Sequence, residues 1–296
     1  MSCSTRGSAI NRILQNWSVR IGATSLLLLV LVALAAPFLG TVDPNLFDPV
    51  SRDLRPGEVG EITTLEGETV KHRFLMGSDS FGRDIYSRVL YGTRVSLVVG
   101  IATAALALAF GIVLGLCAGY LRWLDGPLMR VMDGLMAIPA ILLAIALVAL
   151  WRAGIGTVVA AIAITEIPRV TRLVRSLVLT IREEPYVEAA IALGTPTLKI
   201  MFGHILPNTI APLIVQGTFI CANGILIEAI LSFLGVGLPP DIPTWGNIMA
   251  EGRVQFIEFP HNVFFPGIFL AVTVLAVNIL GDGLRDTLDP KMAKRV

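Results

Sequence analysis

The stretch that decides the fold is residues 182–208, which read REEPYVEAAIALGTPTLKIMFGHILPN. It is a polar island of helix-forming residues between apolar blocks that are long enough to cross a bilayer. Pro185 opens a run of good helix formers, which predicts a short helix over residues 185–193. Gly194 follows and supplies the backbone freedom with which many helices end. The island is therefore expected to begin with one short helix that stops sharply.

A second short helix is expected directly after the first. Thr195 can cap its start, with Pro196 in the first helical position. Apolar side chains then recur at helical spacing and predict one apolar stripe on this helix. They are Leu198, Met201, Phe202 and Ile205. Pro207 is expected to close the helix, because proline has no N–H with which to continue it.

The residue pattern of this island resembles the "EAA…G…LP" loop of ABC importer permeases. The matching residues are Glu188, Ala189, Ala190, Gly194, Leu206 and Pro207. His204 stands where the family usually has isoleucine. In that family the loop faces the cytoplasm and docks into a cleft on the ATPase subunit. The resemblance therefore implies that residues 176–208 form an ATPase-coupling loop, and the alternative is an ordinary amphipathic loop.

Composition places the chain in a membrane rather than in water. Hydrophobic residues make up 54% of the chain and charged residues 15%, whereas average globular proteins carry about 25% charged residues. The net charge of +1 gives no reason to expect a nucleic-acid partner. The three cysteines and three histidines are scattered without ligand spacing, and no Gly-rich phosphate loop occurs. We therefore expect no metal site, no cofactor and no bound ATP in this chain.

Six apolar blocks predict an all-α integral membrane protein with six transmembrane helices, since about 20 apolar residues span the hydrocarbon core. The blocks are 21–40, 95–120, 131–150, 153–175, 209–235 and 263–280, and the fourth could instead stop near residue 167. The first could instead be a signal peptide, because residues 33–36 look like a cleavage site, but its apolar run is long for one. Pro139 and Pro168 are expected to kink the third and fourth helices. Glycines near four-residue spacing between residues 100 and 119 predict close helix packing.

The chain divides into five predicted segments. They are a cytoplasmic N-terminus at 1–20, a first transmembrane helix at 21–40, an extracytoplasmic loop at 41–93, a five-helix permease core at 94–283 and a cytoplasmic tail at 284–296. Within the extracytoplasmic loop, residues 61–74 could form a small hairpin that turns at 66–68. From residue 83 an amphipathic helix is expected on the membrane surface, with Ile85 and Val89 along one side.

Two further segments of the predicted core are expected to lie outside the hydrocarbon. Residues 121–130 form a short polar link between the second and third apolar blocks. Residues 234–262 form a loop rich in proline and glycine between the fifth and sixth blocks.

Three further groups of motifs resemble the dipeptide/oligopeptide/nickel branch of the ABC importer permeases. They are GSDSFGRDIYSR at 77–88 with GTRVSL at 92–97, LSFLGVG at 231–237 with PP at 239–240 and WG at 245–246, and GDGLRD at 281–286 with LDP at 288–290. Ser78 stands where the family usually has threonine. The arginines of the first motif could instead form a catalytic or anion-binding cluster, but no nucleophile or base accompanies them.

The resemblance implies a C-type permease subunit with the type I importer fold and cytoplasmic coupling helices. It implies a heterodimer with a second permease, two ATP-binding subunits that carry ATP and Mg, and an extracytoplasmic solute-binding protein. Alternating access driven by ATP is the implied mechanism. Peptides are the expected substrate, while nickel chelates, opines and oligosaccharides stay open.

The distribution of basic residues predicts the orientation in a bacterial inner membrane. With six spans, most lysines and arginines outside the long 41–93 loop fall on the side that holds both termini and residues 182–208. Long segments cross the membrane largely regardless of charge, so the 41–93 loop does not oppose this reading. Both termini are therefore expected in the cytoplasm.

Polar side chains in the fifth block are candidates for the wall of a translocation path. Gln216, Asn223 and Glu228 lie there, and such groups usually face a bundle interior or water. Glu228 shares one helix face with small residues. They are Gly217, Cys221 and Gly224. A path wall and a subunit contact stay equally open for Glu228, and Glu166 is expected at a span end.

Two other classes of protein stay open. A self-sufficient secondary transporter is disfavoured, because the spans carry few ionisable groups for ion coupling and show no clear inverted repeat. An intramembrane enzyme is disfavoured, because the sequence contains no Gly-x-Ser-x-Gly, no His-Glu-x-x-His and no paired intramembrane aspartates. We therefore expect a transport subunit that is not itself an enzyme.

Overall fold

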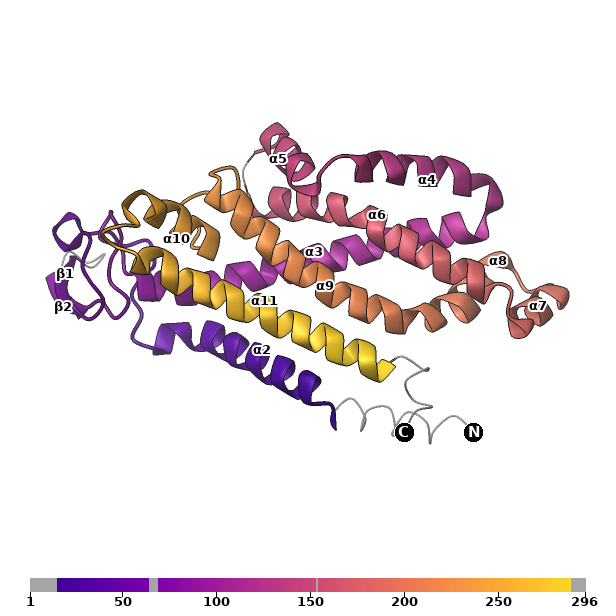
Figure 1. The fold of residues 1–296 in the computed structure, drawn as a ribbon, viewed down its shortest axis with the longest axis horizontal. Coiled ribbons are helices and arrows are strands. Elements are labelled where there is room, and N and C mark those ends of the chain that lie inside the picture. The colour runs from indigo at the N-terminus through magenta and orange to yellow at the C-terminus, as the bar shows by residue number, and fades with distance from the viewer. Residues whose placement is uncertain (1–14, 64–68, 153, 289–296) are drawn as a thin grey trace.

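Long helices run along the main axis of the molecule, with a small sheet at one end and two short helices at the other (Figure 1). The computed structural model describes residues 15–63, 69–152 and 154–288. The long helices are α2 (Trp17–Ala35), α3 (Ile85–Tyr120), α6 (Ile155–Ile181), α9 (Leu206–Phe233) and α11 (His261–Leu288). The shorter helices are α4 (Arg122–Ala137), α5 (Ala140–Leu150), α7 (Pro185–Ala192), α8 (Thr197–Ile200) and α10 (Trp245–Gly252). The strands are β1 (Val59–Thr63) and β2 (Thr69–Arg73). The remaining turns are the 3-10 segments Ala36–Phe38, Pro49–Ser51 and Arg253–Gln255 and the π-helix Met201–Ile205.

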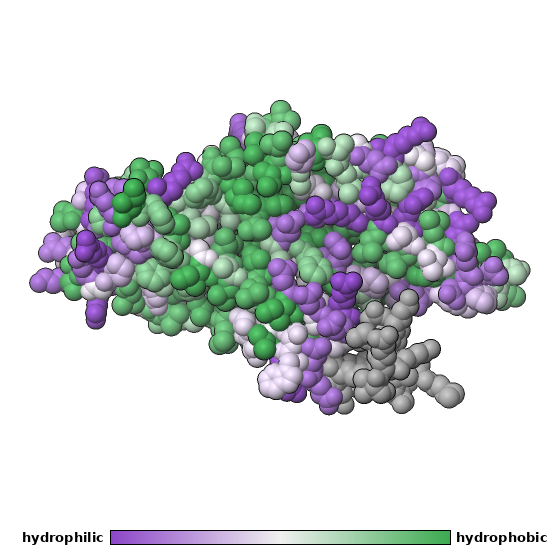
Figure 2. All heavy atoms as spheres, viewed as in Figure 1, coloured by the Kyte–Doolittle hydropathy of each residue, from purple (hydrophilic) through white to green (hydrophobic). Residues whose placement is uncertain are grey.

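The all-α membrane fold is confirmed, while the number of spans stays a prediction. Within the described residues, four helical segments are long and apolar enough to cross a membrane. They are Trp17–Phe38, Ile85–Tyr120, Thr197–Phe233 and His261–Leu288. The bent pair α4 and α5 makes a fifth if it counts as one span. The 27 residues of α6 could cover about 40 Å, but Glu166, Arg169, Arg172 and Arg175 make its second half polar. On the viewed face, hydrophobic side chains gather over the middle of the bundle (Figure 2).

Close packing of α3 explains why its glycines recur near four-residue spacing. The glycines face valines of α6 with the same spacing, in the pairs Gly111 with Val170, Gly115 with Val174 and Gly119 with Val178. A Cβ added at Gly115 would lie 2.5 Å from the Cβ of Val174, which is closer than two carbon atoms approach. Gly100 meets Ile225 of α9 in the same way. The predicted close helix packing is confirmed, and it places α3 between α6 and α9.

The predicted hairpin is also confirmed. β1 pairs antiparallel with β2, so that Val59 stands opposite Arg73 and Thr63 opposite Thr69. The predicted turn at 66–68 lies outside the described residues, as do most of the predicted N-terminal segment and tail. The first helix begins at Trp17 rather than residue 21, because the Asn16 side chain accepts hydrogen bonds from the backbone N–H groups of Ser18 and Val19.

The structure differs from the predicted surface helix that starts at residue 83. Asp84 caps α3 by accepting a hydrogen bond from the Ser87 backbone N–H at 2.9 Å, and the helix then runs unbroken to Tyr120. The side chains of Ile85 and Arg88 are fully buried, so this end of α3 packs inside the protein and does not form a separate surface helix. Sequence periodicity missed this because it treats every arginine as exposed, although partners elsewhere in the chain allow one to be buried.

A buried cluster of two arginines and two acids joins the start of α3 to α10. Its members are Asp79, Arg83, Arg88 and Glu251. Arg83 Nε lies 2.7 Å from Asp79 Oδ2, and its Nη2 contacts Glu251. Arg88 Nη2 lies 3.4 Å from Glu251 Oε2. Burial raises the pKa of Glu251, and Arg88 and Arg83 act against that shift. The formal charges of the four groups cancel, which indicates a scaffold rather than a catalytic or anion-binding arginine cluster.

Two other expectations about the core are corrected in part. The predicted polar link at 121–130 is not a loop but the first half of α4. The predicted break at Pro139 is confirmed as a bend of 93° between α4 and α5, while their being one span stays a prediction. Ile138 adopts an extended conformation, which a following proline favours. The predicted loop at 234–262 contains α10, whose Trp245 is fully buried and donates from Nε1 to the carbonyl oxygen of Val89 at 3.2 Å.

Candidate functional site

The first short helix of the predicted coupling loop is confirmed as α7, and its end has a defined geometry. Gly194 has φ +74°, a left-handed backbone that glycine adopts without strain. Its N–H donates to the Ile191 carbonyl oxygen at 2.9 Å, and the Thr195 N–H donates to the Ala190 carbonyl oxygen at 3.1 Å. These two bonds form a Schellman motif, which satisfies carbonyl groups that the helix end leaves free. Gly194 therefore sets the direction in which the chain leaves α7.

The second short helix differs from its prediction at both ends. Pro196 precedes the helix as its cap residue rather than opening it. Pro207 does not close it, because α8 continues through the π-helix Met201–Ile205 into α9. In the π-helix the Leu206 N–H donates to the carbonyl oxygen of Met201, five residues earlier, and such a widened turn is a known way for a helix to accommodate a proline. Residues 197–233 thus form one continuous helical segment of 37 residues.

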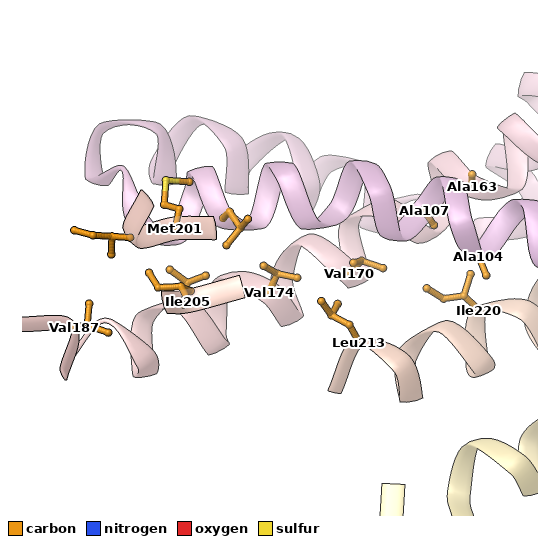
Figure 3. Close-up of a cluster of buried hydrophobic side chains, with 13 residues drawn as sticks. Ala104, Ala107, Ala163, Val170, Val174, Val187, Met201, Ile205, Leu213 and Ile220 are labelled. Carbon is orange, nitrogen blue, oxygen red and sulfur yellow. The ribbon is translucent and has the colours of Figure 1, made fainter. Parts of the chain in front are cut away.

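The coupling loop has a buried face that holds it to the bundle. Val187 of α7 and Ile200, Met201 and Ile205 of the following segment are buried in one cluster with Val174 and Val178 of α6. Figure 3 shows Val174, Met201 and Ile205 continuing the core of the bundle toward Val187 of α7. The predicted single stripe is therefore wrong, because its four members lie on two faces. Met201 and Ile205 are buried, whereas Leu198 and Phe202 are exposed.

The opposite face of the loop exposes large apolar side chains. Leu193 is 85% exposed and Leu198 69% exposed. Ile191 and Phe202 are also exposed. Side chains of this size rarely gather on a solvated surface without a partner. Ile191 and Leu193 were not predicted as site residues; the sequence signal for them is that both apolar side chains lie within three residues before Gly194, which ends α7.

The six predicted coupling residues occupy two adjoining places in the structure. Glu188, Ala189 and Gly194 are exposed on α7 and its end, and Ala190 is buried beneath them. Leu206 and Pro207 begin α9. A hydrogen bond of 3.0 Å from Asn208 Nδ2 to Tyr186 Oη joins the two places, and neither of these residues was predicted. The structure brings the six residues to one end of the molecule but does not test their role.

A polar cleft lies between α6, α9 and α11. Its volume is about 270 Å³. The polar side chains that line it are Glu166, Arg169, Gln216, Asn223 and Asn278. Apolar side chains, including Phe219 and Leu226, complete the wall. Two predicted path residues, Gln216 and Asn223, thus share one cleft, while their role in transport stays a prediction.

Glu166 was expected near a span end as a capping or interfacial acid, but it lies buried near the middle of α6 and organises the cleft. Its carboxylate is buried and receives hydrogen bonds from Arg169 Nη1 at 3.1 and 3.3 Å and from Asn223 Nδ2 at 2.6 Å. Arg169 sits one helical turn after Glu166 on α6, and Asn223 lies on α9. The network therefore fixes α6 against α9 and orients Arg169 and Asn223 at the cleft.

Glu228 lies outside the cleft, fully buried on α9. Ser232 Oγ donates to Glu228 Oε1 at 2.8 Å, and among the described residues Oε2 has no hydrogen-bond partner. The small-residue face near Glu228 packs against α3, where a Cβ added at Gly224 would lie 3.3 Å from Thr103. The structure thus separates Glu228 from the two other predicted path residues.

Within the described residues, no cluster of three or more histidine, cysteine, aspartate or glutamate side chains could hold a metal ion.

Comparison with known proteins gives consistent matches. Residues 107–294 match the family described as "Binding-protein-dependent transport system inner membrane component". A Sinorhizobium fredii protein named "Probable peptide ABC transporter permease protein y4tQ" is 49% identical over 277 residues, covering 94% of this chain and 90% of that protein. The dipeptide transport system permease protein DppC of Alkalihalophilus pseudofirmus is 45% identical, covering 83% of this chain and 81% of that protein. The glutathione transport system permease protein GsiD of Pectobacterium atrosepticum is 44% identical, covering 77% and 75%.

Proposed function

The chain belongs to the family of binding-protein-dependent transport system inner membrane components, and we propose that its role there is to conduct short peptides and to couple their passage to ATP hydrolysis by separate subunits. It is a permease subunit of an ABC importer. Peptide substrates are favoured because the relatives compared above are named for peptide, dipeptide or glutathione transport.

One observation carries the proposal of coupling. The continuous helical segment 197–233 exposes Leu198 and Phe202 at one end and contributes Gln216 and Asn223 to the polar cleft. Leu198 and Gln216 lie 18 residues apart, which corresponds to about 27 Å along a helix. Because the chain is helical over that whole length, a displacement of the exposed apolar end would be passed along the segment to the cleft wall. A movement of the ATPase subunits would thus reach the path through one element.

The proposed partners follow from the same geometry and from the family. The exposed apolar face of the coupling loop would dock on one of two ATPase subunits, which bind ATP and Mg; this chain binds neither. A second permease would complete the path, because the cleft on this chain is small, with a volume of about 270 Å³. An extracytoplasmic solute-binding protein would deliver the peptide at the end that carries β1, β2 and α10.

The proposed orientation places both termini and the coupling loop in the cytoplasm. The start of α2 and the end of α11 lie together, since a Cβ added at Gly283 would approach the backbone nitrogen of Val19 to 2.8 Å. In Figure 1 these two helix ends point toward the half of the molecule that holds α7 and α8, away from the sheet. This arrangement supports the orientation that the basic residues predict.

The proposal is tested by uptake into vesicles that contain the complete transporter. The complex of this chain with its second permease and ATPases is reconstituted, its binding protein is added outside, and a panel of labelled di- and tripeptides is offered. We expect uptake that requires both ATP at the ATPases and loaded binding protein. Peptide uptake that a proton or sodium gradient drives without ATP would contradict the proposal and favour a secondary transporter. ATP-dependent uptake of a different solute, with no peptide uptake, would contradict the substrate.

A further inference from the structure

The cleft between α6, α9 and α11 contains more hydrogen-bonding capacity than the chain uses. Gln216 and Asn278 make no side-chain hydrogen bond within the described residues, and the amide oxygen of Asn223 accepts none there. Within the described residues, the guanidinium of Arg169 donates hydrogen bonds only from Nη1. An arginine offers five N–H groups, so several donors remain for another molecule. Polar groups within membrane segments are costly unless a partner or water satisfies them.

The formal charges of Glu166 and Arg169 in the cleft cancel, but the group that an entering molecule can reach is the positive one. Glu166 is buried and both of its oxygens already accept hydrogen bonds. The side chain of Arg169 is 51% exposed. An entering molecule therefore meets the guanidinium and not the carboxylate. Glu166 accepts hydrogen bonds from Arg169 Nη1 and is itself held by Asn223 Nδ2, so Arg169 is pre-oriented. A guanidinium is well suited to bind a carboxylate through two parallel hydrogen bonds.

The size and the lining of the cleft match the end of a peptide. At about 30 Å³ per water molecule, its volume of about 270 Å³ holds roughly nine non-hydrogen atoms. This is enough for a terminal carboxylate, its residue and the preceding peptide group. Carboxamide side chains both donate and accept hydrogen bonds, as peptide groups do. A wall of three carboxamides would bind main chain while accepting different side chains.

Resting on the proposed function, we infer that this cleft is a peptide-recognition subsite within the permease. Arg169 binds the terminal α-carboxylate of the peptide, and Gln216, Asn223 and Asn278 bind its main-chain groups. Glu166 is a positioning residue that holds Arg169 and Asn223 in place. The subsite holds a peptide that has left the binding protein, so that it does not diffuse back before the path opens to the cytoplasm.

The test is the number of peptides transported per ATP hydrolysed, measured in vesicles that contain the complete complex. The probe is labelled dialanine, at concentrations that saturate the binding protein. We expect Arg169→Gln to lower this ratio about tenfold or more, the effect of losing a charged hydrogen-bond pair, while loaded binding protein still stimulates ATP hydrolysis. Arg169→Lys keeps a cation and should restore part of the ratio. A merely structural role of Arg169 would lower uptake and hydrolysis together.

Arg172→Gln is the matched control. Arg172 lies on the same helix, its side chain is also 51% exposed, and it pairs with Asp133 instead of lining the cleft. We expect its ratio to stay within about twofold of the wild type. Gln216→Leu is the second variant, because Gln216 makes no side-chain hydrogen bond within the described residues on which folding could depend. Its ratio should fall although the complex assembles normally.

A second probe tests the carboxylate directly. Dialanine amide lacks the negative charge, so the wild-type complex should transport it with a ratio about tenfold below that of dialanine. The Arg169→Gln complex should transport the two probes with the same ratio of peptides to ATP hydrolysed. Loading of the binding protein with each probe is verified separately by calorimetry, so the comparison reports the permease.

Several results would overturn the inference while leaving the proposed function intact. They are unchanged ratios in both Arg169→Gln and Gln216→Leu, equal ratios for the two probes in the wild type, or loss of the second permease from the Arg169→Gln complex, which would assign the cleft to a subunit contact. If the wild-type complex hydrolyses ATP but transports no short peptide, the proposed function itself fails.

Discussion

Replacing Gly194 by valine should weaken ATPase attachment while leaving the membrane helices intact. The residue has φ +74°, and a Cβ built there meets no atom within 4 Å. Steric contact with neighbours is thus absent, and the whole effect comes from the backbone. A left-handed conformation costs an L-amino acid about 1–2 kcal/mol, and a β-branched side chain makes that conformation especially rare.

That energy acts on the turn that orients α7. An eight-residue helix has little stability by itself, so α7 depends on its buried residues Val187 and Ala190 and on the Schellman bonds at its end. A cost of 1–2 kcal/mol corresponds to a factor of about 5–30 in population. When the docked geometry is only partly populated, the apparent affinity falls by the same factor. We therefore expect Gly194→Val to weaken ATPase binding by up to about 30-fold.

The assay is titration of the purified permease pair with its ATPase subunits, followed by the response of ATP hydrolysis to loaded binding protein. Gly194→Asn is the control, because asparagine tolerates a left-handed backbone better than other side chains. It should bind the ATPases within a few-fold of the wild type. Equal affinity and equal stimulation for Gly194→Val and the wild type would refute the role of this turn. Loss of the permease pair in Gly194→Val would refute the independence of the membrane helices.

Three other predictions test separate parts of the structure. Because Glu228 lies outside the cleft and amide and carboxylate have the same shape, Glu228→Gln should assemble and transport normally; assembly with lost uptake would restore a path role. Glu251→Ala leaves two buried arginines short of a partner and should lower the free energy of unfolding by about 3–5 kcal/mol. Asp133→Ala breaks an exposed pair and should lower it by less than about 1 kcal/mol. Similar thermal unfolding midpoints for the two variants in detergent would contradict the buried cluster. In a form without native cysteines, Val59→Cys should react with a membrane-impermeant thiol reagent in intact cells and Leu198→Cys should not, and the reverse labelling would invert the proposed orientation.

Local sequence patterns predicted those parts of the fold that depend on local rules. The Pro185 start of α7 and the left-handed Gly194 at its end follow from backbone preferences of single residues. The glycine spacing in α3 predicted close packing because a missing side chain has the same consequence in any partner helix. The short hairpin of β1 and β2 was likewise visible in alternating residues around a turn.

Features that depend on distant partners could not be predicted in this way. The sequence around Arg88 predicts a surface residue. It is buried because Glu251, far along the chain, supplies the opposite charge. The sequence predicts Glu166 to be a capping or interfacial acid, because it does not show that Arg169 and Asn223 donate to its carboxylate oxygens. Pro207 reads as a helix stop, because sequence periodicity contains no sign of the widened turn that precedes it.

The residues that line the cleft were predicted only in part, for the same reason. Gln216 and Asn223, two of the three predicted path residues, line the cleft, and their role in transport stays a prediction. Asn278 was missed, because only packing of α11 against α9 brings it near them. Leu193 was missed, because exposure of an apolar side chain is a property of the folded surface and not of the residue type.

The most direct test of the central claim is cross-linking between this chain and the ATPase subunits in native membranes. Single cysteines are placed at Leu193 on the coupling loop and, as the control, at Val254 beside α10; the two native side chains are 85% and 83% exposed. With a short thiol cross-linker, Leu193→Cys should form a covalent adduct with an ATPase subunit, and Val254→Cys should form none. An ATPase adduct at Val254→Cys, or none at Leu193→Cys in an assembled complex that transports its substrate, would contradict the claim that this loop couples the ATPases to the path.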